Sequence, residues 1–220
     1  MRELHILGGG FAGVWAAMSA AAERDTYDAR DVRIRLFSNS PSLTIRPRLY
    51  EGASPDLRVP LAPLMKEIGV DFSVAEASNI VPQTRTIHFA DGSDSRYDRL
   101  VLATGSRLRP LPIPGADIHA FSIDTFEEAS RLDRHLEQLP PGDEASATVV
   151  IIGASFTGLE LATELRSRLG KETRIILVDR MTKIGADLGA NPEPHIEEAI
   201  KTCDIETRLE TGERQSAPMR

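Results

Sequence analysis

A glycine-rich turn close to the N-terminus constrains the fold of this chain more than any other feature. The sequence Gly8-x-Gly10-x-x-Gly13 follows a short apolar run at 4–7 and precedes an Ala-rich run at 11–23. Between a strand and a helix, the first glycine permits a tight turn, and the second lets a pyrophosphate approach the backbone. The third lets helix and strand pack closely. The pattern therefore predicts a strand–turn–helix unit that binds a dinucleotide at the helix N-terminus.

A second turn of the same kind lies near the middle of the chain. Gly153-x-Ser155-x-x-Gly158 follows the apolar run 148–152 and precedes a helical run at 156–169. Serine in the middle position adds a Cβ close to the expected phosphates, and its hydroxyl could donate a hydrogen bond to them. We therefore expect a second dinucleotide-binding unit.

The strand that closes the first unit lacks the acid that normally accepts the adenosine ribose hydroxyls. Run 32–37 is followed by Ser38 and Asn39, both neutral. Either side chain could hydrogen-bond a ribose, although a neutral contact is weaker than a charge-assisted one. Dinucleotide binding remains the better interpretation of this unit.

The second unit keeps that acid. Its closing strand, expected over 174–178, ends at Asp179. A carboxylate there accepts from a ribose 2′-hydroxyl and repels a 2′-phosphate, which favours NAD over NADP. Arg180 follows directly, and a guanidinium can pair with a 2′-phosphate, so NADP stays open as an alternative.

The two units predict an α/β protein with two Rossmann-like dinucleotide-binding units, the second of them incomplete at the C-terminus. The Pro-rich stretch 109–115 has no helical or strand period and suggests a crossing between domains 1–110 and 111–220. The Asp-Gly pair at 91–92 predicts a hairpin turn, and Asp124 is expected to cap a helix. Further strands are expected over 70–74, 84–89, 95–97 and 99–103, helices over 61–68, 124–139 and 191–201, and a frayed tail over 209–220.

Composition excludes several classes of protein. A net charge of −7 with scattered basic residues argues against a nucleic-acid surface. The single cysteine, Cys203, excludes an internal disulfide and fits a reducing cytoplasm. No window approaches the roughly 20 apolar residues of a membrane span, so membrane contact is expected to be peripheral at most. No metal-ligand spacing occurs among the histidines, which we expect at the surface or in loops: His5, His88, His119, His135 and His195.

Several further stretches resemble the pyridine-nucleotide-dependent flavoprotein oxidoreductases, in which an NAD domain is inserted into an FAD domain. Residues 97–106, ending in Ala-Thr-Gly-Ser, are similar to the family's ATG motif, which contacts FAD before the crossing to the NAD domain. Residues 111–115 are similar to its Ile-Pro-Gly segment. Gly158-x-Glu160-x-Ala162 matches the family's GxExA continuation, whose acid lies toward the nicotinamide and flavin.

The segment 46–51, Arg-Pro-Arg-Leu-Tyr-Glu, is similar to the one that passes the flavin in type II NADH dehydrogenases and ferredoxin reductases. A plain basic loop is the alternative interpretation of these residues. Disulfide reductases carry a CxxxxC pair instead, and one cysteine excludes that chemistry. The resemblance implies an FAD-dependent oxidoreductase that accepts hydride from NAD(P)H and passes electrons to a quinone or a small redox protein.

The resemblance also implies the cofactor-binding residues. None of them is expected to act as an acid or base, because hydride transfer to flavin does not require one. For FAD they are Gly8, Gly10, Phe11, Ala12, Gly13, Ser38, Asn39, Arg46, Ala103, Thr104 and Gly105. For NAD(H) they are Gly153, Ser155, Phe156, Thr157, Gly158, Glu160 and Asp179.

Family members continue beyond the point where this chain stops, with the rest of the NAD domain, a Gly-Asp motif at the flavin and a C-terminal domain. The resemblance therefore implies a C-terminally truncated chain. A truncated fragment that binds FAD or NAD without turnover is the alternative function. A single-cofactor dehydrogenase ranks last, because the three tyrosines (Tyr27, Tyr50 and Tyr97) lack a lysine at YxxxK spacing.

Overall fold

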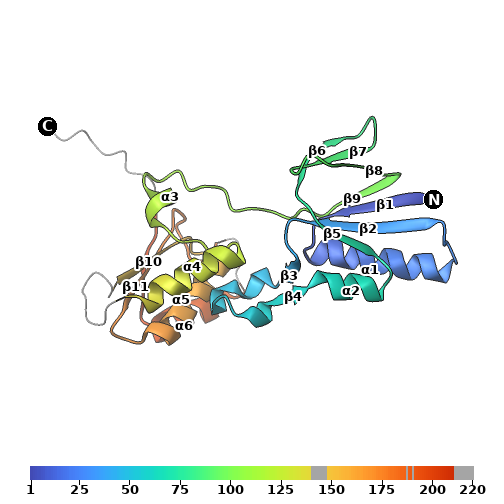
Figure 1. Cartoon of the computed structure of the whole chain (residues 1–220). Helices are drawn as coiled ribbons and strands as arrows, with labels where there is room; N and C mark the ends of the chain where they lie inside the picture. Colours follow the sequence, from blue (N-terminus) through green and yellow to red (C-terminus); the bar gives the residue numbers. More distant parts are fainter. Residues whose placement is uncertain (140–147, 187, 190, 211–220) are drawn as a thin grey trace. The chain divides into compact units, whose positions relative to one another are not determined.

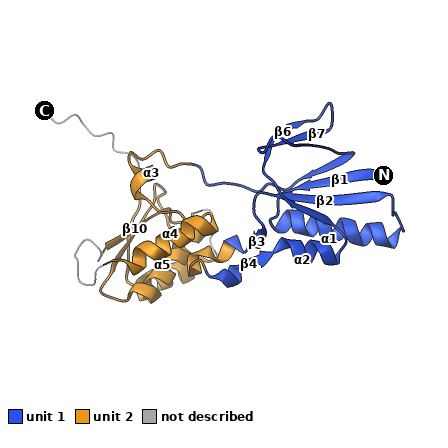
Figure 2. Ribbon diagram, viewed as in Figure 1, with its two compact units in different colours: residues 1–46, 54–109 blue, residues 47–53, 110–220 orange. Residues whose placement is uncertain are grey.

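The computed structural model describes residues 1–139, 148–186, 188–189 and 191–210. The chain divides into two compact units (Figures 1 and 2). Unit 1 comprises residues 1–46 and 54–109, and unit 2 comprises residues 47–53 and 110–220. The two units meet in sequence at residue 110, and a short stretch inside the first half of the chain belongs to unit 2.

A four-stranded parallel sheet forms the centre of unit 1, in the order β5-β2-β1-β9. Each strand is a short run of mainly apolar residues, and the glycine turn follows the central strand β1. The strands are β1 (Arg2–Leu7), β2 (Val32–Ser38), β5 (Asp71–Val74) and β9 (Arg99–Leu102). The carboxyl ends of β1, β2 and β9 therefore lie at the same edge of the sheet, where a ligand of an open α/β sheet binds.

Helices α1 (Phe11–Thr26) and α2 (Leu61–Glu67) pack on one face of this sheet. The small residues of α1 let it approach closely, and Ala17 is fully buried. The core between helices and sheet consists of Ile6, Val14, Ala17, Ala21, Ile34, Leu36, Leu61, Met65 and Val70. A continuous apolar surface thus fixes the first turn of α1 against the end of β1.

An antiparallel sheet of β6 (Ala77–Val81), β7 (Thr86–Phe89) and β8 (Asp94–Arg96) packs on the other face. Leu7 and Phe37 of the parallel strands contact Ile87 and Phe89 of this sheet. The predicted hairpin is confirmed: β7 and β8 pair antiparallel across the Asp-Gly turn, where Ser93 donates to Asp91. Unit 1 therefore has three layers, and its central strands are covered on both faces as their apolar runs predict.

His5 corrects one prediction. It is fully buried on β1 rather than at the surface, with its ring edge-on to Phe37 at 5.2 Å between centroids. Its Nε2 lies 3.3 Å from a Glu3 carboxylate oxygen, and its Nδ1 has no hydrogen-bond partner. Burial lowers the pKa of His5, with Arg35 and Arg33 acting in the same direction and Glu3 opposing them. His5 is therefore a neutral core residue between the two sheets.

Short elements connect β2 to α2. Strands β3 (Ser42–Thr44) and β4 (Arg58–Pro60) form a two-stranded antiparallel ladder. Between them lie two 3₁₀ turns, η1 (Arg46–Glu51) and η2 (Pro55–Leu57), the second capped by the Ser54 side chain. The sequence pattern did not predict these elements, because each is too short to show a period.

Unit 2 contains a three-stranded parallel sheet in the order β10-β11-β12. The predicted elements at 148–152, 156–169 and 174–178 are confirmed at both ends. Residues from all three strands and from three helices form one core. The elements are β10 (Thr148–Ile152), β11 (Arg174–Val178), β12 (Ile205–Arg208), α3 (Ala116–His119), α4 (Phe126–Glu137), α5 (Phe156–Leu169) and α6 (Glu193–Thr202).

The start of α4 corrects a second prediction, because Thr125 and not Asp124 is the N-cap. Thr125 accepts from the Glu128 backbone N–H, and the Glu128 carboxylate accepts from the Thr125 backbone in return. This capping box begins the helix at Phe126. The helix ends at Glu137, two residues before the predicted end. Of the tail predicted over 209–220, residues 211–220 lie outside the described residues.

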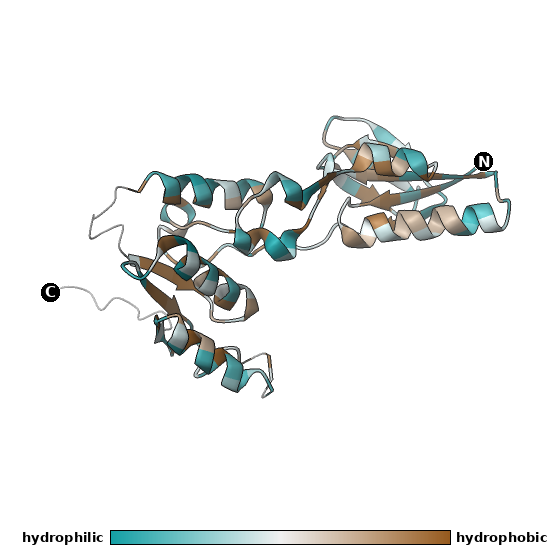
Figure 3. Cartoon of the chain, turned by 90° about the horizontal axis from the view of Figure 1, so that it is seen from below, coloured by the Kyte–Doolittle hydropathy of each residue, from teal (hydrophilic) through white to brown (hydrophobic). Residues whose placement is uncertain are grey.

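Strand β10 is covered on one face only, although its sequence is continuously apolar. Ile151 faces the core, whereas Val150 and Ile152 are 55% and 48% exposed. The apolar character of the strands in both units is visible in Figure 3. Continuous apolar runs are typical of parallel strands that are buried on both faces, and within the described residues β10 departs from that pattern. Across the described ranges, no helix combines the length and apolar character that crossing a bilayer requires.

Candidate functional site

The first glycine turn closes through backbone contacts that no side chain could share. Gly8 has φ +114° and donates its N–H to the Phe37 carbonyl at 2.8 Å. A Cβ on Gly8 would lie 2.0 Å from the Ala103 carbonyl oxygen, and one on Gly13 would lie 1.8 Å from the Gly8 oxygen. Strand β1, helix α1 and the end of β9 therefore meet with no room for a methyl group.

Gly10 differs from its neighbours because a Cβ there would meet no atom within 4 Å. It is the N-cap of α1 in an extended conformation, without a side-chain cap and with no acid in the first turn. The first backbone N–H groups of a helix have no intrahelical acceptors and carry the positive end of the helix dipole. The open space at Gly10 thus lies beside a helix end that favours a negatively charged group. Phe11 and Ala12 lie in the same turn and are exposed.

The two neutral residues at the end of β2 lie in different environments. Ser38 is 5% exposed, and its hydroxyl accepts from the Ser40 backbone at 3.1 Å. A Cβ on Gly9 would lie 2.5 Å from that hydroxyl oxygen. Asn39 is exposed. Ser38 therefore supports the glycine turn, and Asn39 is the more accessible of the two for a ribose.

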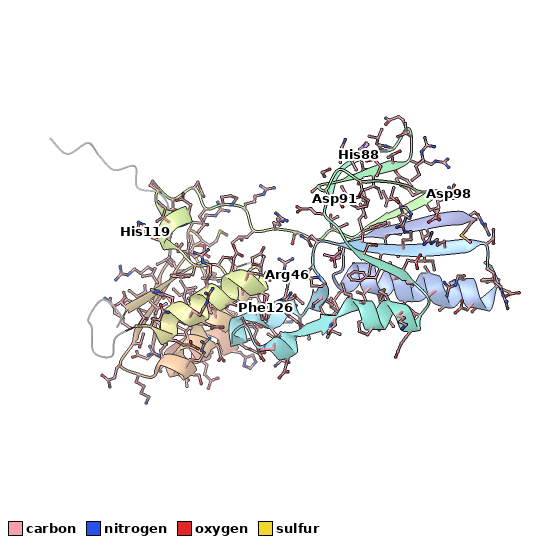
Figure 4. The ribbon with its side chains drawn as sticks, in the orientation of Figure 1. Arg46, His88, Asp91, Asp98, His119 and Phe126 are labelled. Carbon is pink, nitrogen blue, oxygen red and sulfur yellow. The ribbon has the colours of Figure 1, made fainter. Side chains whose placement is uncertain are left out.

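Arg46 and the ATG-like motif come together at the same edge of the unit 1 sheet. The Ala103 N–H donates to the Leu7 carbonyl, which places Thr104 directly beside the glycine turn. Gly105 has φ +73°. Arg46 (Figure 4) donates to the Ser106 carbonyl at 3.0 Å. Eleven predicted residues of unit 1, from Gly8 to Gly105, thus lie around the carboxyl ends of β1, β2 and β9.

The second turn repeats this geometry within unit 2. Gly153 has φ +108° and donates to the Val178 carbonyl at 2.9 Å. A Cβ on Gly158 would lie 1.8 Å from the Gly153 oxygen. Ser155 is the N-cap of α5, and Phe156 and Thr157 form its exposed first turn. The same close packing of helix on strand therefore forms at both turns.

Asp179 lies against this second turn with both carboxylate oxygens engaged. One oxygen accepts from the Ala154 backbone N–H at 2.6 Å, and the other accepts from the Met181 N–H at 2.8 Å. These two bonds fix the carboxylate next to the turn. Its position agrees with a ribose-binding acid at the end of the second strand.

An acidic cluster lies beside α5 in unit 2. Burial raises the pKa of Glu160, and the negative charge of Glu51 raises it further. Burial also raises the pKa of Tyr50, as do the charges of Glu160 and Glu51. Arg48 pairs with Glu51 through bonds of 2.8 and 2.5 Å and lowers the pKa of Glu51. Glu160 is a predicted site residue, whereas its charge interaction with Glu51 joins residues too far apart in sequence for a local pattern to show.

Two strand–glycine–helix turns with the same backbone contacts, one in each unit, define a protein with two dinucleotide-binding domains. The chain belongs to the pyridine nucleotide-disulphide oxidoreductase family, whose model matches residues 2–217. FAD and NAD(H) are the cofactors of this family.

Curated relatives agree with this assignment, and a solved structure shares the fold. An NADH dehydrogenase-like protein of Mycobacterium tuberculosis, MT1860, is 37% identical over 220 residues, which cover 94% of this chain and 55% of that protein. The demethylphylloquinone reductase NdbB of Synechocystis is 30% identical over 198 residues, covering 86% of this chain and 48% of that protein. The ferredoxin reductase of Rhodopseudomonas palustris superposes with a TM-score of 0.81 at 22% identity, over 100% of this chain and 53% of its own.

The chain thus spans about half the length of the curated relatives that it matches. The structural likeness, at 22% identity, concerns the fold.

Proposed function

We propose that unit 1 binds FAD, that unit 2 binds NADH, and that the chain takes part in passing hydride from the nicotinamide to the flavin. The observation that carries this proposal is the repeated turn. In both units a Cβ on the third glycine would lie 1.8 Å from the carbonyl oxygen of the first. In unit 1 the middle glycine faces open space. This combination suits a backbone that a pyrophosphate approaches closely.

The work of the chain is to bind and orient the two cofactors. When bound, FAD and NADH supply the redox chemistry themselves. Gly8, Gly10 and Gly13 leave the N-terminus of α1 open to the FAD pyrophosphate, and Thr104 and Gly105 border the same site. Arg46, which is held by the Ser106 carbonyl, adds positive charge at this edge.

In unit 2 the N-terminus of α5 would receive the NADH pyrophosphate at Gly153, Ser155 and Gly158. Asp179 is fixed in place to accept from a ribose hydroxyl, and its charge disfavours a 2′-phosphate. We therefore propose NADH as the preferred donor, with NADPH the alternative because Arg180 follows Asp179. Glu160 would lie on the nicotinamide side, as the resemblance implies.

We propose a quinone or a small electron-transfer protein as the acceptor. NdbB is named as a demethylphylloquinone reductase, which supports a quinone. The R. palustris structure is a ferredoxin reductase, which supports a small protein. One cysteine leaves no internal disulfide to form, and we place the reaction in the cytoplasm.

A second candidate is binding of the nucleotides without turnover. It is favoured by one observation, the neutral Ser38 and Asn39 at the end of β2, where an acid normally binds the ribose. Unit 1 and unit 2 would then each bind a nucleotide with no hydride passing between them.

The visible spectrum of the purified chain tests the two candidates. After incubation with FAD and gel filtration, the chain should retain flavin absorption at about 450 nm, which NADH should bleach in the absence of oxygen. Gly10→Ala is the matched control, because it places a methyl group in the proposed phosphate space without meeting protein atoms. It should fold and retain less flavin. Retained flavin that NADH leaves unchanged would support binding without turnover, and a colourless protein would refute both FAD proposals.

A further inference from the structure

The exposed face of helix α4 in unit 2 carries cationic and amide side chains. Positions 131, 134, 135 and 138 follow the spacing i, i+3, i+4 and i+7, which places side chains on one side of a helix. On the other side, Ala129 is buried and Leu136 packs against the core of unit 2. The proposed binding of FAD and NADH uses none of the exposed side chains, which are Arg131, Arg134, His135 and Gln138.

These four side chains and Phe121 line a hollow of about 240 Å³, called here the α4 hollow. Phe121 precedes the helix, and its ring stacks on His135 with 4.5 Å between centroids and 25° between planes. The Arg131 guanidinium carbon lies 5.8 Å from the centre of the same ring, within reach of a cation–π contact. Phe121 is still 39% exposed, so part of its ring remains open to a ligand.

The α4 hollow is lined by hydrogen-bond donors and by no carboxylate. Arg134 donates its Nε–H to the Ser130 carbonyl at 3.2 Å, which fixes the direction of its guanidinium. Neither arginine of the hollow forms an ion pair with a carboxylate of the described residues. The acids of the same helix, Glu127, Glu128 and Glu137, are not among the lining residues. The hollow therefore presents positive charge that its own lining does not neutralise.

Basic side chains near the end of a helix also stabilise it through the helix dipole. Arg134 and His135, in the last turn of α4, fit that explanation. It does not account for Arg131 in the middle of the helix, or for the Phe121 ring that contacts both Arg131 and His135. Guanidinium groups bind phosphate oxygens in pairs, and an aromatic ring attracts a second ring. The lining thus suits a phosphate that is attached to an aromatic group.

We propose that the α4 hollow is a binding site for the phosphate monoester of a small aromatic compound. Arg131 and Arg134 bind the phosphate oxygens, and Phe121 contacts the aromatic group. His135 and Gln138 supply further N–H donors at the rim. The hollow shares no residue with the two glycine turns, so this inference does not rest on the proposed function.

NMR titration of the whole chain with phenyl phosphate and with inorganic phosphate tests the proposal. Chemical shifts of the His135 ring and of the Nε–H groups of Arg131 and Arg134 report binding at the α4 hollow, separately from the glycine turns. Phenyl phosphate should bind there about two- to tenfold more tightly than inorganic phosphate, the factor expected for one aromatic contact. Phe121→Leu keeps an apolar side chain but removes the aromatic ring, and it should abolish this difference.

Three charge variants show whether the arginines bind the phosphate. Arg131→Gln and Arg134→Gln should each weaken both ligands about two- to fivefold, the loss expected for one exposed ion pair. Lys171→Gln is the matched control, because it removes the same charge from an exposed position elsewhere in unit 2. It should leave binding at the α4 hollow unchanged. Both arginines are exposed, so their variants should keep the Tm of the wild type.

Four outcomes would overturn the proposal. Shifts that do not saturate, or equal weakening by Lys171→Gln, would show only a general attraction of anions. Wild-type affinity in both arginine variants would remove the phosphate contacts, and equal affinity for the two ligands would refute the aromatic group. If NADH shifts the His135 signals as phenyl phosphate does, the hollow is part of the nucleotide site and not a separate one. Absence of NADH binding would refute the function proposed for unit 2 and leave this test unaffected.

Discussion

Replacement of the third glycine in the first turn should destabilise unit 1 far more than replacement of the second. In Gly13→Ala the new Cβ would lie 1.8 Å from the Gly8 carbonyl oxygen and 2.9 Å from its carbon. Both atoms are backbone, held by the bond from Gly8 N–H to the Phe37 carbonyl. Neither can rotate away, so α1 must move from β1. Gly10→Ala meets no atom within 4 Å.

The expected magnitudes differ accordingly. Overpacking of this kind costs about 1–3 kcal/mol, and backbone obstruction favours the upper part of that range. Unit 1 has about 100 residues, so a loss of about 2 kcal/mol lowers its Tm by roughly 8–16 °C. Gly10→Ala replaces a glycine N-cap by a poorer one, which costs about 0.5 kcal/mol. The free energy of unfolding should therefore be highest for the wild type, slightly lower for Gly10→Ala and lowest for Gly13→Ala.

Urea unfolding followed by circular dichroism measures these free energies, and retention of FAD after gel filtration measures binding. Gly10→Ala should lose flavin affinity while its free energy of unfolding falls by only about 0.5 kcal/mol, whereas Gly13→Ala should lose both affinity and stability. Equal stability of the two variants would refute the packing argument. Wild-type FAD affinity in Gly10→Ala would show that the pyrophosphate does not approach residue 10.

Three further predictions concern other parts of the chain. Asp179→Ala should lower the free energy of unfolding of unit 2 by about 1–2 kcal/mol in urea, because two backbone N–H groups lose their acceptor. It should also narrow any preference for NADH over NADPH, measured as the ratio of the two dissociation constants. The folded-state pKa of His5 is below its unfolded value of about 6.5, so the unfolded state binds the extra proton and stability should fall as the pH drops below about 6.5. His5→Leu should remove that part of the pH dependence, and identical pH profiles of stability would contradict the assignment. Thr125→Ala breaks the capping box of α4 and should cost unit 2 about 1 kcal/mol, whereas a change below the error of a thermal melt would show that the box is unimportant.

Local patterns in the sequence were sufficient for the elements around the two turns. Helix α5 and strands β10 and β11 have their predicted ends, because glycines and apolar runs mark both ends of each element. The sequence Thr125-x-x-Glu128 also carries the capping-box pattern of α4. This pair outweighs Asp124 as the N-cap because its reciprocal bonds satisfy two backbone N–H groups at once.

Other features depend on contacts that sequence patterns do not show. Strands β6 and β12 contain polar residues and gain their stability by pairing with β7 and β11, which no local propensity reveals. The burial of His5 depends on the antiparallel sheet that covers the far face of β1. The sequence leaves Ser38 and Asn39 as equal candidates for a ribose contact, and only the structure shows that the Ser38 hydroxyl lies close to Gly9.

The placement of residues 47–53 in unit 2 has a consequence for the order in which the chain folds. The contact from Ala53 to Asp133 spans 80 residues, and closing such a distant pair is slow compared with forming the local turns. During synthesis the segment leaves the ribosome before most of unit 2 exists, so it must wait for α4 and α5. Unit 1 can complete its parallel sheet only once β9, which ends at Leu102, has been synthesised. At that point residues 47–53 do not yet have their partners in unit 2. Unit 2 is therefore expected to reach its native state last, in a step that slows when Asp133 is replaced.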